Sequence, residues 1–146
     1  MSITVADIEA ARAVLGDVVR RTPVIASRVL AERLGGPVWL KCENLQRTGS
    51  FKIRGAYVRI ARLSAEERAA GVVAASAGNH AQGVAFAAGL LGTPVVVFMP
   101  EGAPIPKVEA ARSYGADVRF AGRTVDESLE AATAFATDSG SVLIHP

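Results

Sequence analysis

From residue 72 to residue 144 the sequence alternates short valine-rich runs with longer segments whose apolar residues recur at helical spacing. A strand that is apolar at every position is buried on both faces, and strands separated by helices pair in parallel. This alternation predicts an α/β fold, an open parallel sheet with helices on both faces. The expected strands are at 72–76, 94–99, 117–120 and 141–144, and the expected helices are at 79–91, 105–114 and 125–137.

Residues with capping side chains mark the helix starts that precede this region: Thr4, Ser27, Ser50 and Ser64. Thr4 and Ser64 are each followed three residues later by an acidic residue, which is the spacing of a capping box. We expect the first helix to continue to about Val18 and the second to end at Gly35. A strand is expected at 37–42.

Composition excludes several functional classes. The chain has 146 residues, half of them hydrophobic, which is enough for one ordinary core. Its apolar runs are far shorter than the roughly 20 residues of a membrane span, and its start lacks the layout of a signal peptide, so a cytoplasmic, membrane-free protein is expected. The arginines are scattered, which argues against nucleic-acid binding. Cys42, His80 and His145 lack the spacing of a zinc site, so no metal is expected.

Lys52 stands where a lysine is least expected. Ile53, Ala56 and Ile60 recur at helical spacing after Ser50, which places Lys52 in the first turn of a helix. The positive pole of the helix dipole disfavours a cation there by about 0.3–1 kcal/mol. Such a position favours the neutral amine, which is the form that adds to a carbonyl group.

A second candidate site, SAGNHAQG at 76–83, directly follows the expected strand 72–76. In parallel sheets, ligands bind at the carboxyl ends of strands, where helix amino ends present free N–H groups. Ala77 and Gly78 would allow close approach of an anion, and the loop lacks the glycine patterns of dinucleotide and nucleotide sites. An amine next to a carboxylate cradle suits imine chemistry on a small amino or keto acid. The alternatives are a lysine that merely reaches solvent and a purely structural turn.

The run KCENLQRTGSFKIRGA at 41–56 resembles the lysine motif of the pyridoxal-phosphate enzymes of the tryptophan-synthase β type, fold type II, and specifically of the threonine and serine dehydratases. The run SAGNHAQGVAFAA at 76–88 is similar to the asparagine loop of the same group, and VVVFMPEGAPIPKVEAARSYGADV and the closing IHP also match. The resemblance therefore extends over nearly the whole chain.

This resemblance implies that Lys52 forms the imine bond to pyridoxal phosphate, that Phe51 packs on one face of the pyridine ring and that Asn79 hydrogen-bonds the ring's phenolic oxygen. Free Lys52 would remove the α-proton of the substrate before the β-hydroxyl leaves. Alternatively, Phe51 is a core residue and His80 supports the loop. The implied cradle for the substrate carboxylate consists of Ser76, Ala77, Gly78, Asn79 and His80.

The implied reaction is deamination of L-threonine, with L-serine as a further substrate, to a 2-oxo acid and ammonia, a lyase step of amino-acid metabolism that isoleucine biosynthesis uses. Serine racemases need a serine where this chain has Ala77, which favours elimination over racemisation. Cysteine synthases carry other runs around the lysine. A non-catalytic module that binds amino acids or pyridoxal phosphate remains the alternative.

In this family the glycine-rich loop for the cofactor phosphate lies beyond the position that matches Pro146. The resemblance thus implies that 1–47 opens a large domain, that 48–146 forms a small domain with a four-stranded parallel sheet, and that the full-length enzyme is a homo-oligomer. We expect the 146-residue chain alone to bind pyridoxal phosphate weakly and to be nearly inactive.

Overall fold

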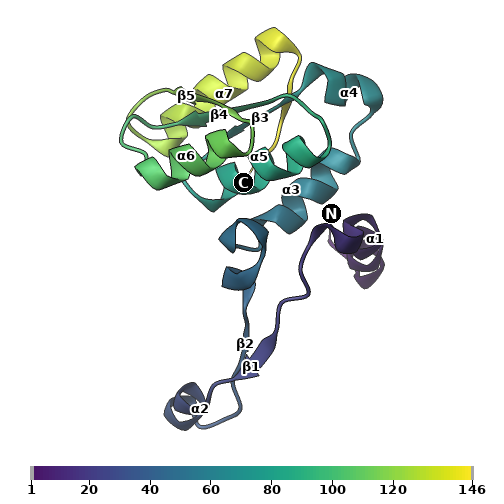
Figure 1. Cartoon of the computed structure of the whole chain (residues 1–146), viewed down its shortest axis with the longest axis vertical. Helices are drawn as coiled ribbons and strands as arrows, with labels where there is room; N and C mark the ends of the chain where they lie inside the picture. Colours follow the sequence, from purple (N-terminus) through teal and green to yellow (C-terminus); the bar gives the residue numbers. More distant parts are fainter. Residues whose placement is uncertain (1, 146) are drawn as a thin grey trace.

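The computed structural model describes residues 2–145. It consists of an α/β unit and an N-terminal arm that extends away from it (Figure 1). The unit contains one four-stranded sheet in the order β5-β4-β3-β6, with every neighbouring pair parallel. Its strands are β3 (Val72–Ala75), β4 (Val95–Met99), β5 (Asp117–Phe120) and β6 (Val142–Leu143).

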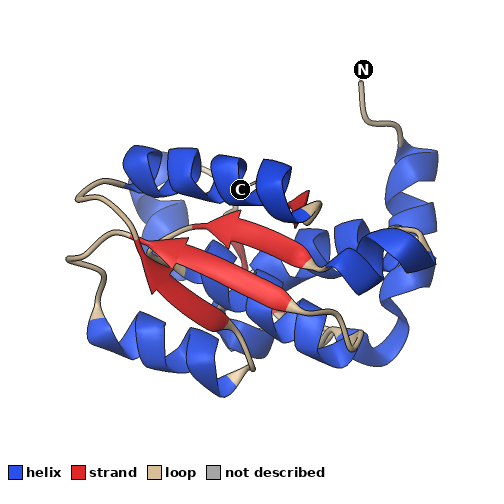
Figure 2. Cartoon of the chain, turned by 90° about the horizontal axis from the view of Figure 1, so that it is seen from above, coloured by secondary structure: helices blue, strands red, loops and turns tan. Residues whose placement is uncertain are grey.

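Helices cover both faces of this sheet (Figure 2). On one face, α5 (Asn79–Leu90) and α6 (Ile105–Ser113) pack against the strands, and α3 (Lys52–Ala61) packs on α5. On the other face, α7 (Val125–Ser139) contributes Ala132 and Leu129 to a second core cluster. The two clusters separate because successive side chains of β3 point to opposite faces. The short helix α4 (Ala65–Ala70) leads into β3.

Strand β3 lies at the centre of this arrangement. All four of its residues are buried, and it pairs with β4 on one side and β6 on the other. Strand β5 is an edge strand, and three of its four residues are exposed. The central position of β3 fixes the place of whatever loop follows it.

The arm is built from short elements that bury little. Helix α1 (Val5–Leu15) packs on α3, whereas the antiparallel pair of β1 (Val24–Ala26) and β2 (Trp39–Lys41) is exposed at every position. A two-stranded sheet is marginal on its own in water. The remaining elements are α2 (Arg28–Leu34) and the 3₁₀ turns η1 (Gly16–Val18), η2 (Glu43–Leu45) and η3 (Arg47–Gly49).

The four-stranded parallel sheet with helices on both faces confirms the fold predicted from the alternating pattern. The capping boxes at Thr4 and Ser64 and the end of α2 at Gly35 are also confirmed. Two boundaries were wrong. The first helix stops at Leu15, because Gly16 has a φ of 44° and the chain continues as a 3₁₀ turn to Val18. Helix α3 has Phe51 rather than Ser50 at its N-cap, although Ser50 Oγ still accepts a hydrogen bond of 3.4 Å from the Lys52 backbone N–H.

Helices α3 and α5 meet at a glycine. A Cβ atom added to Gly83 of α5 would lie 3.0 Å from the carbonyl carbon of Lys52 and 3.2 Å from the backbone nitrogen of Ile53. These neighbours are backbone atoms, so no side-chain rotation could relieve the crowding. The hydrogen at Gly83 is therefore what lets the first turn of α3 approach α5 so closely.

An ion pair ties the arm to the α/β unit. Glu43 of η2 accepts two hydrogen bonds of 2.8 Å from the guanidinium of Arg54 on α3, and a third of 2.5 Å from the Thr22 hydroxyl. Beside it, buried Gln46 bonds both the N–H and the carbonyl of Arg20, at 2.8 Å each. Arg54 is thus a structural residue. The Arg54 hydrogen bond, with smaller help from Thr22, lowers the pKa of Glu43 from 4.5 to about 2.

Within residues 2–145, the helices are too short or too polar to cross a lipid bilayer.

We predict that Gly83→Ala lowers the free energy of unfolding by about 1–2 kcal/mol, because crowding of the α3 backbone exceeds the gain of about 1 kcal/mol in helix propensity. Gly55→Ala on the exposed side of α3 is the matched control, since nothing lies within 4 Å of a Cβ there. That variant should gain about 0.5–1 kcal/mol. Thermal unfolding measures both variants. Equal stabilisation by the two alanines would show that α3 and α5 are not held together at Gly83.

We also predict that Glu43→Gln lowers the free energy of unfolding at pH 7 by about 1–2 kcal/mol, through loss of hydrogen bonds to a charged group. Because folding lowers the pKa of Glu43 from 4.5 to about 2, its contribution is complete above about pH 4.5 and is lost as the pH falls through about 2. The difference between wild type and variant should shrink over that range.

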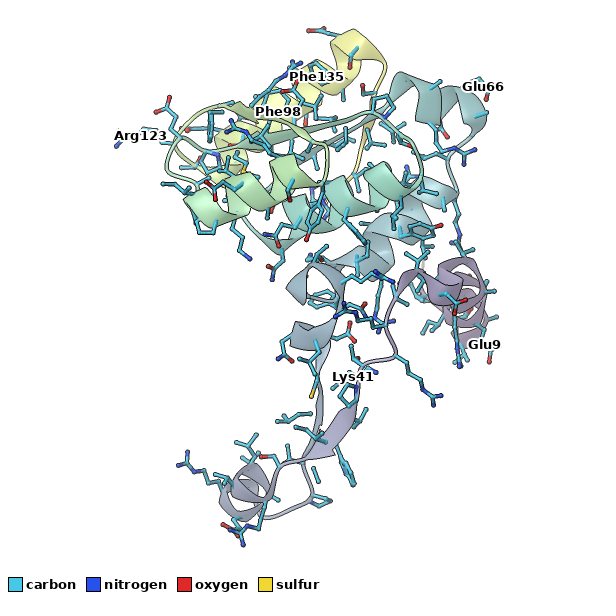
Figure 3. The ribbon with its side chains drawn as sticks, in the orientation of Figure 1. Glu9, Lys41, Glu66, Phe98, Arg123 and Phe135 are labelled. Carbon is cyan, nitrogen blue, oxygen red and sulfur yellow. The ribbon has the colours of Figure 1, made fainter. Side chains whose placement is uncertain are left out.

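Urea unfolding at several pH values between 7 and 2 measures this difference. Glu9→Gln on α1 is the control, because the Glu9 side chain points into solvent (Figure 3). A Glu43→Gln effect that kept its full size at pH 2 would contradict the role of the ion pair.

Candidate functional site

The candidate site lies at the carboxyl end of β3. Residues 76–78 connect β3 to the start of α5, and residues 100–104 connect the neighbouring strand β4 to the start of α6. Because the two strands are parallel and adjacent, both connections emerge at the same edge of the sheet. The Gly83 contact adds the first turn of α3 to the same region. Three helix amino ends from separate parts of the sequence therefore come together.

Lys52 is the first residue of α3 and is half-buried. Its Nζ lies 5.5 Å from the centre of the Phe51 ring, which is 59 % exposed. Phe51 is therefore not a core residue, and the alternative that assigned it to the core was wrong. A flat, electron-poor ring can stack on the exposed face of Phe51 while it is next to the Lys52 amine.

The turn before Lys52 is strained. Thr48 has a φ of 62°, in the left-handed region where a residue other than glycine costs about 1–2 kcal/mol. Its Oγ1 atom is also buried and lacks a hydrogen-bond partner among residues 2–145. Backbone strain of this kind persists where surrounding contacts hold it, often at ligand sites. The turn sets the direction in which Ser50, Phe51 and Lys52 leave η3.

Ala77 and the start of α5 present backbone donors, whereas the Ser76 N–H donates to the Phe98 carbonyl oxygen at 3.1 Å. Ser76 Oγ accepts a hydrogen bond of 3.1 Å from the Gly78 N–H, and α5 begins at Asn79 without a side-chain cap. The N–H groups of a helix's first turn have no partner inside the helix. Ser76, Ala77 and Gly78 are half-buried and Asn79 is exposed, so an anion can reach these donors.

His80 differs from its neighbours because its side chain is directed inward. It is 7 % exposed, and its Nε2 lies 2.9 Å from the carbonyl oxygen of Ile144, beyond β6. A carbonyl oxygen only accepts, so Nε2 carries the proton and donates. Burial lowers the pKa of His80, with a smaller lowering by the charge of Lys52. The neutral imidazole ties the α5 amino end to β6, which agrees with the alternative that His80 supports the loop.

Asn79 has a partner that the sequence did not suggest. Its Oδ1 accepts a hydrogen bond of 2.9 Å from Nζ of Lys107, which lies in the first turn of α6. Sequence reasoning also gave no role to Gly83. The signal for Lys107 was available, because the helix after β4 must begin beside the helix after β3 if those strands are neighbours. The signal for Gly83 was not, since helix–helix distances cannot be read from spacing.

A large groove lies elsewhere in the described chain. It has a volume of about 1210 Å³ and runs between α1 and α3, next to Arg54 and Arg62. Neither Lys52 nor residues 76–80 line it. The candidate site is therefore separate from this groove.

Curated proteins that are similar to this chain are named as ammonia-lyases. L-threonine ammonia-lyase of Thermotoga maritima is 54 % identical over 144 residues, which are 99 % of this chain and 36 % of that protein. The L-threonine ammonia-lyase of Geobacter sulfurreducens is 54 % identical over 128 residues, 88 % of this chain and 32 % of that protein. The chain thus spans about a third of the length of these curated relatives.

Solved structures have the same fold. Maize serine racemase superposes with a TM-score of 0.92 at 36 % identity, covering 100 % of this chain and 44 % of that one. The processed form of threonine deaminase isoform 2 from Solanum lycopersicum superposes with a TM-score of 0.84 at 39 % identity, covering 95 % of this chain and 38 % of that one. The family model described as "Pyridoxal-phosphate dependent enzyme" matches residues 15–146. A match over that much of the sequence places this chain in the family of pyridoxal-phosphate dependent enzymes.

Proposed function

We propose that this chain forms the lysine-bearing part of a lyase that deaminates L-threonine, and L-serine as a secondary substrate, to a 2-oxo acid and ammonia. The observation that carries the proposal is the close approach of Lys52 to the amino end of α5, where a Cβ on Gly83 would lie 3.0 Å from the Lys52 carbonyl carbon. An amine and a carboxylate cradle are the two groups that an amino-acid substrate requires.

The residues fit pyridoxal phosphate. The cofactor needs an amine for its aldehyde, a face on which its ring can stack and a donor for its phenolic oxygen. Lys52 supplies the amine, the exposed Phe51 ring supplies the face, and the Asn79 amide supplies the donor. When bound, the cofactor acts as an electron sink for the bond that breaks at the substrate Cα.

The chain's own groups account for substrate binding and for removal of the proton at Cα. The N–H groups of Ala77 and of the first turn of α5 bind the substrate carboxylate and orient the Cα–H bond. Lys52 Nζ then removes the proton from Cα. The contact of α3 with α5 fixes the backbone of Lys52 in place for this step. Ala77 has no group that can carry a proton, which supports elimination rather than racemisation.

The names of similar proteins also support deamination over racemisation. The relatives called L-threonine ammonia-lyase are 54 % identical to this chain, whereas the serine racemase of maize is 36 % identical. The racemase remains the second candidate because of its TM-score of 0.92. Both isoleucine biosynthesis and threonine breakdown use this deamination.

The division into domains belongs to the proposal. Residues 1–47 would form the opening of a large domain, and 48–146 the small domain of a cytoplasmic homo-oligomeric enzyme as long as the curated relatives. The β1–β2 pair, exposed at every position, and the groove between α1 and α3 are the surfaces that further residues of such an enzyme would cover.

Borohydride trapping tests the assignment of Lys52. We expect that reduction of the purified chain with pyridoxal phosphate attaches the pyridoxyl group to Lys52 at least about ten times more than to the other lysines, because only Lys52 combines an amine with the Phe51 face. Peptide mass mapping measures the label on each lysine. Lys41 is the internal control, since its Nζ donates to the Thr22 carbonyl oxygen at 2.6 Å. Equal labelling of Lys41 and Lys52 would refute the site.

A chimera tests the reaction. The 144 residues of this chain that match Thermotoga maritima L-threonine ammonia-lyase at 54 % identity should replace the corresponding part of that protein. We expect 2-oxobutanoate from L-threonine, and a fall of at least about 10³-fold on Lys52→Ala, which removes the base.

Formation of D-serine from L-serine should be detectable only after Ala77→Ser, which restores the proton carrier of a racemase. D-serine from the unmodified chimera would favour the racemase. A folded chimera that bound pyridoxal phosphate but turned over neither amino acid would favour the non-catalytic module.

A further inference from the structure

Lys107 contacts the candidate site although it belongs to a different helix. Its Nζ donates a hydrogen bond of 2.9 Å to Oδ1 of Asn79, across the gap between the first turns of α6 and α5. The buried side chains of Val108 and Ala111 hold α6 against the core, so the backbone of Lys107 is fixed. An ammonium group is therefore presented to one edge of the Asn79 amide.

The chemistry of the two groups fixes the orientation of that amide. A lysine ammonium group has only donors, whereas an asparagine side chain has an oxygen that accepts on one edge and a nitrogen that donates on the other. The edge that faces Lys107 must be the oxygen. The Asn79 NH₂ group is consequently turned away from Lys107 and remains available to a ligand.

We infer that Lys107 is a positioning residue, which holds the Asn79 amide so that its N–H, and not its carbonyl oxygen, faces the phenolic oxygen of pyridoxal phosphate. The inference rests on the proposed function, because it requires the cofactor to lie beside Asn79. Without Lys107 the amide can turn by about 180° at little cost, because the terminal torsion of asparagine is broad and nearly two-fold. The oxygen would then face an acceptor and repel it.

The first test needs no cofactor. In the ¹⁵N-labelled chain, Lys107→Met should increase the mobility of the Asn79 side-chain amide measured by ¹⁵N relaxation, whereas Lys107→Arg should not. Arg123→Met is the control for loss of a positive charge, because the Arg123 side chain points away from the molecule (Figure 3). Unchanged mobility in Lys107→Met would overturn the inference.

The second test is a double-mutant cycle on the affinity for pyridoxal phosphate. Lys107→Met and Asn79→Ala should each weaken binding by about 10- to 150-fold, which is the range for loss of one hydrogen bond to a charged group. If Lys107 acts only through Asn79, the double variant should bind no more weakly than Asn79→Ala alone. Pyridoxal without the phosphate should show the same ratio.

The outcomes separate this inference from the proposed function. Additive effects, or an effect that disappears with pyridoxal, would show that Lys107 contacts the cofactor phosphate directly and would overturn the positioning role alone. If Lys52 is labelled but neither Lys107→Met nor Asn79→Ala changes affinity, the role of both residues is refuted while the lysine assignment stands. If Lys52 is not labelled, the proposed function and this inference both fail.

Discussion

The contact between α3 and α5 at Gly83 is the constraint on which the rest of the candidate site depends. It brings the backbone of Lys52 against a helix that begins at the loop after the central strand. The contact needs a hydrogen atom where other residues have a Cβ, and the atoms opposite it are backbone. A methyl group at this position would therefore push the first turn of α3, which carries Lys52, away from α5 by a few tenths of an ångström.

The charges around the candidate site favour binding of an anion. Helix amino ends from α5 and α6, together with the Lys107 ammonium group, bring positive charge to this edge of the sheet, which suits an anion. Neutral His80 adds no charge to this region and instead joins α5 to the segment after β6. Asn79 is the polar group whose orientation the Lys107 ammonium group determines.

The arm has a different character from the α/β unit. Its attachment depends on polar contacts, chiefly the Glu43–Arg54 pair and Gln46 with Arg20, whereas its strands expose both faces. Such an arrangement costs stability in isolation, since two strands with no covered face bury little apolar area. The family relatives are about three times as long as this chain, so their additional residues provide surface that could cover such an arm.

Local sequence was sufficient wherever a short-range rule decides the structure. Capping boxes at Thr4 and Ser64, the glycine after α2 and the alternation of strands with helices all act within a few residues, and they predicted the parallel sheet and its helices correctly. The same rules placed Lys52 at a helix start and residues 76–80 after a strand. Errors were confined to the ends of helices, where the conformation of Gly16 and the turn before Lys52 decide.

Tertiary structure decided what those elements do to one another. That Phe51 is exposed, that His80 turns inward to Ile144 and that Lys107 reaches Asn79 each depend on the packing of segments that lie tens of residues apart. The sequence by itself determined which residues begin each helix, because capping and periodicity are local. Only the folded chain determined which helix ends meet, because that depends on the order of strands in the sheet and on the close packing at Gly83.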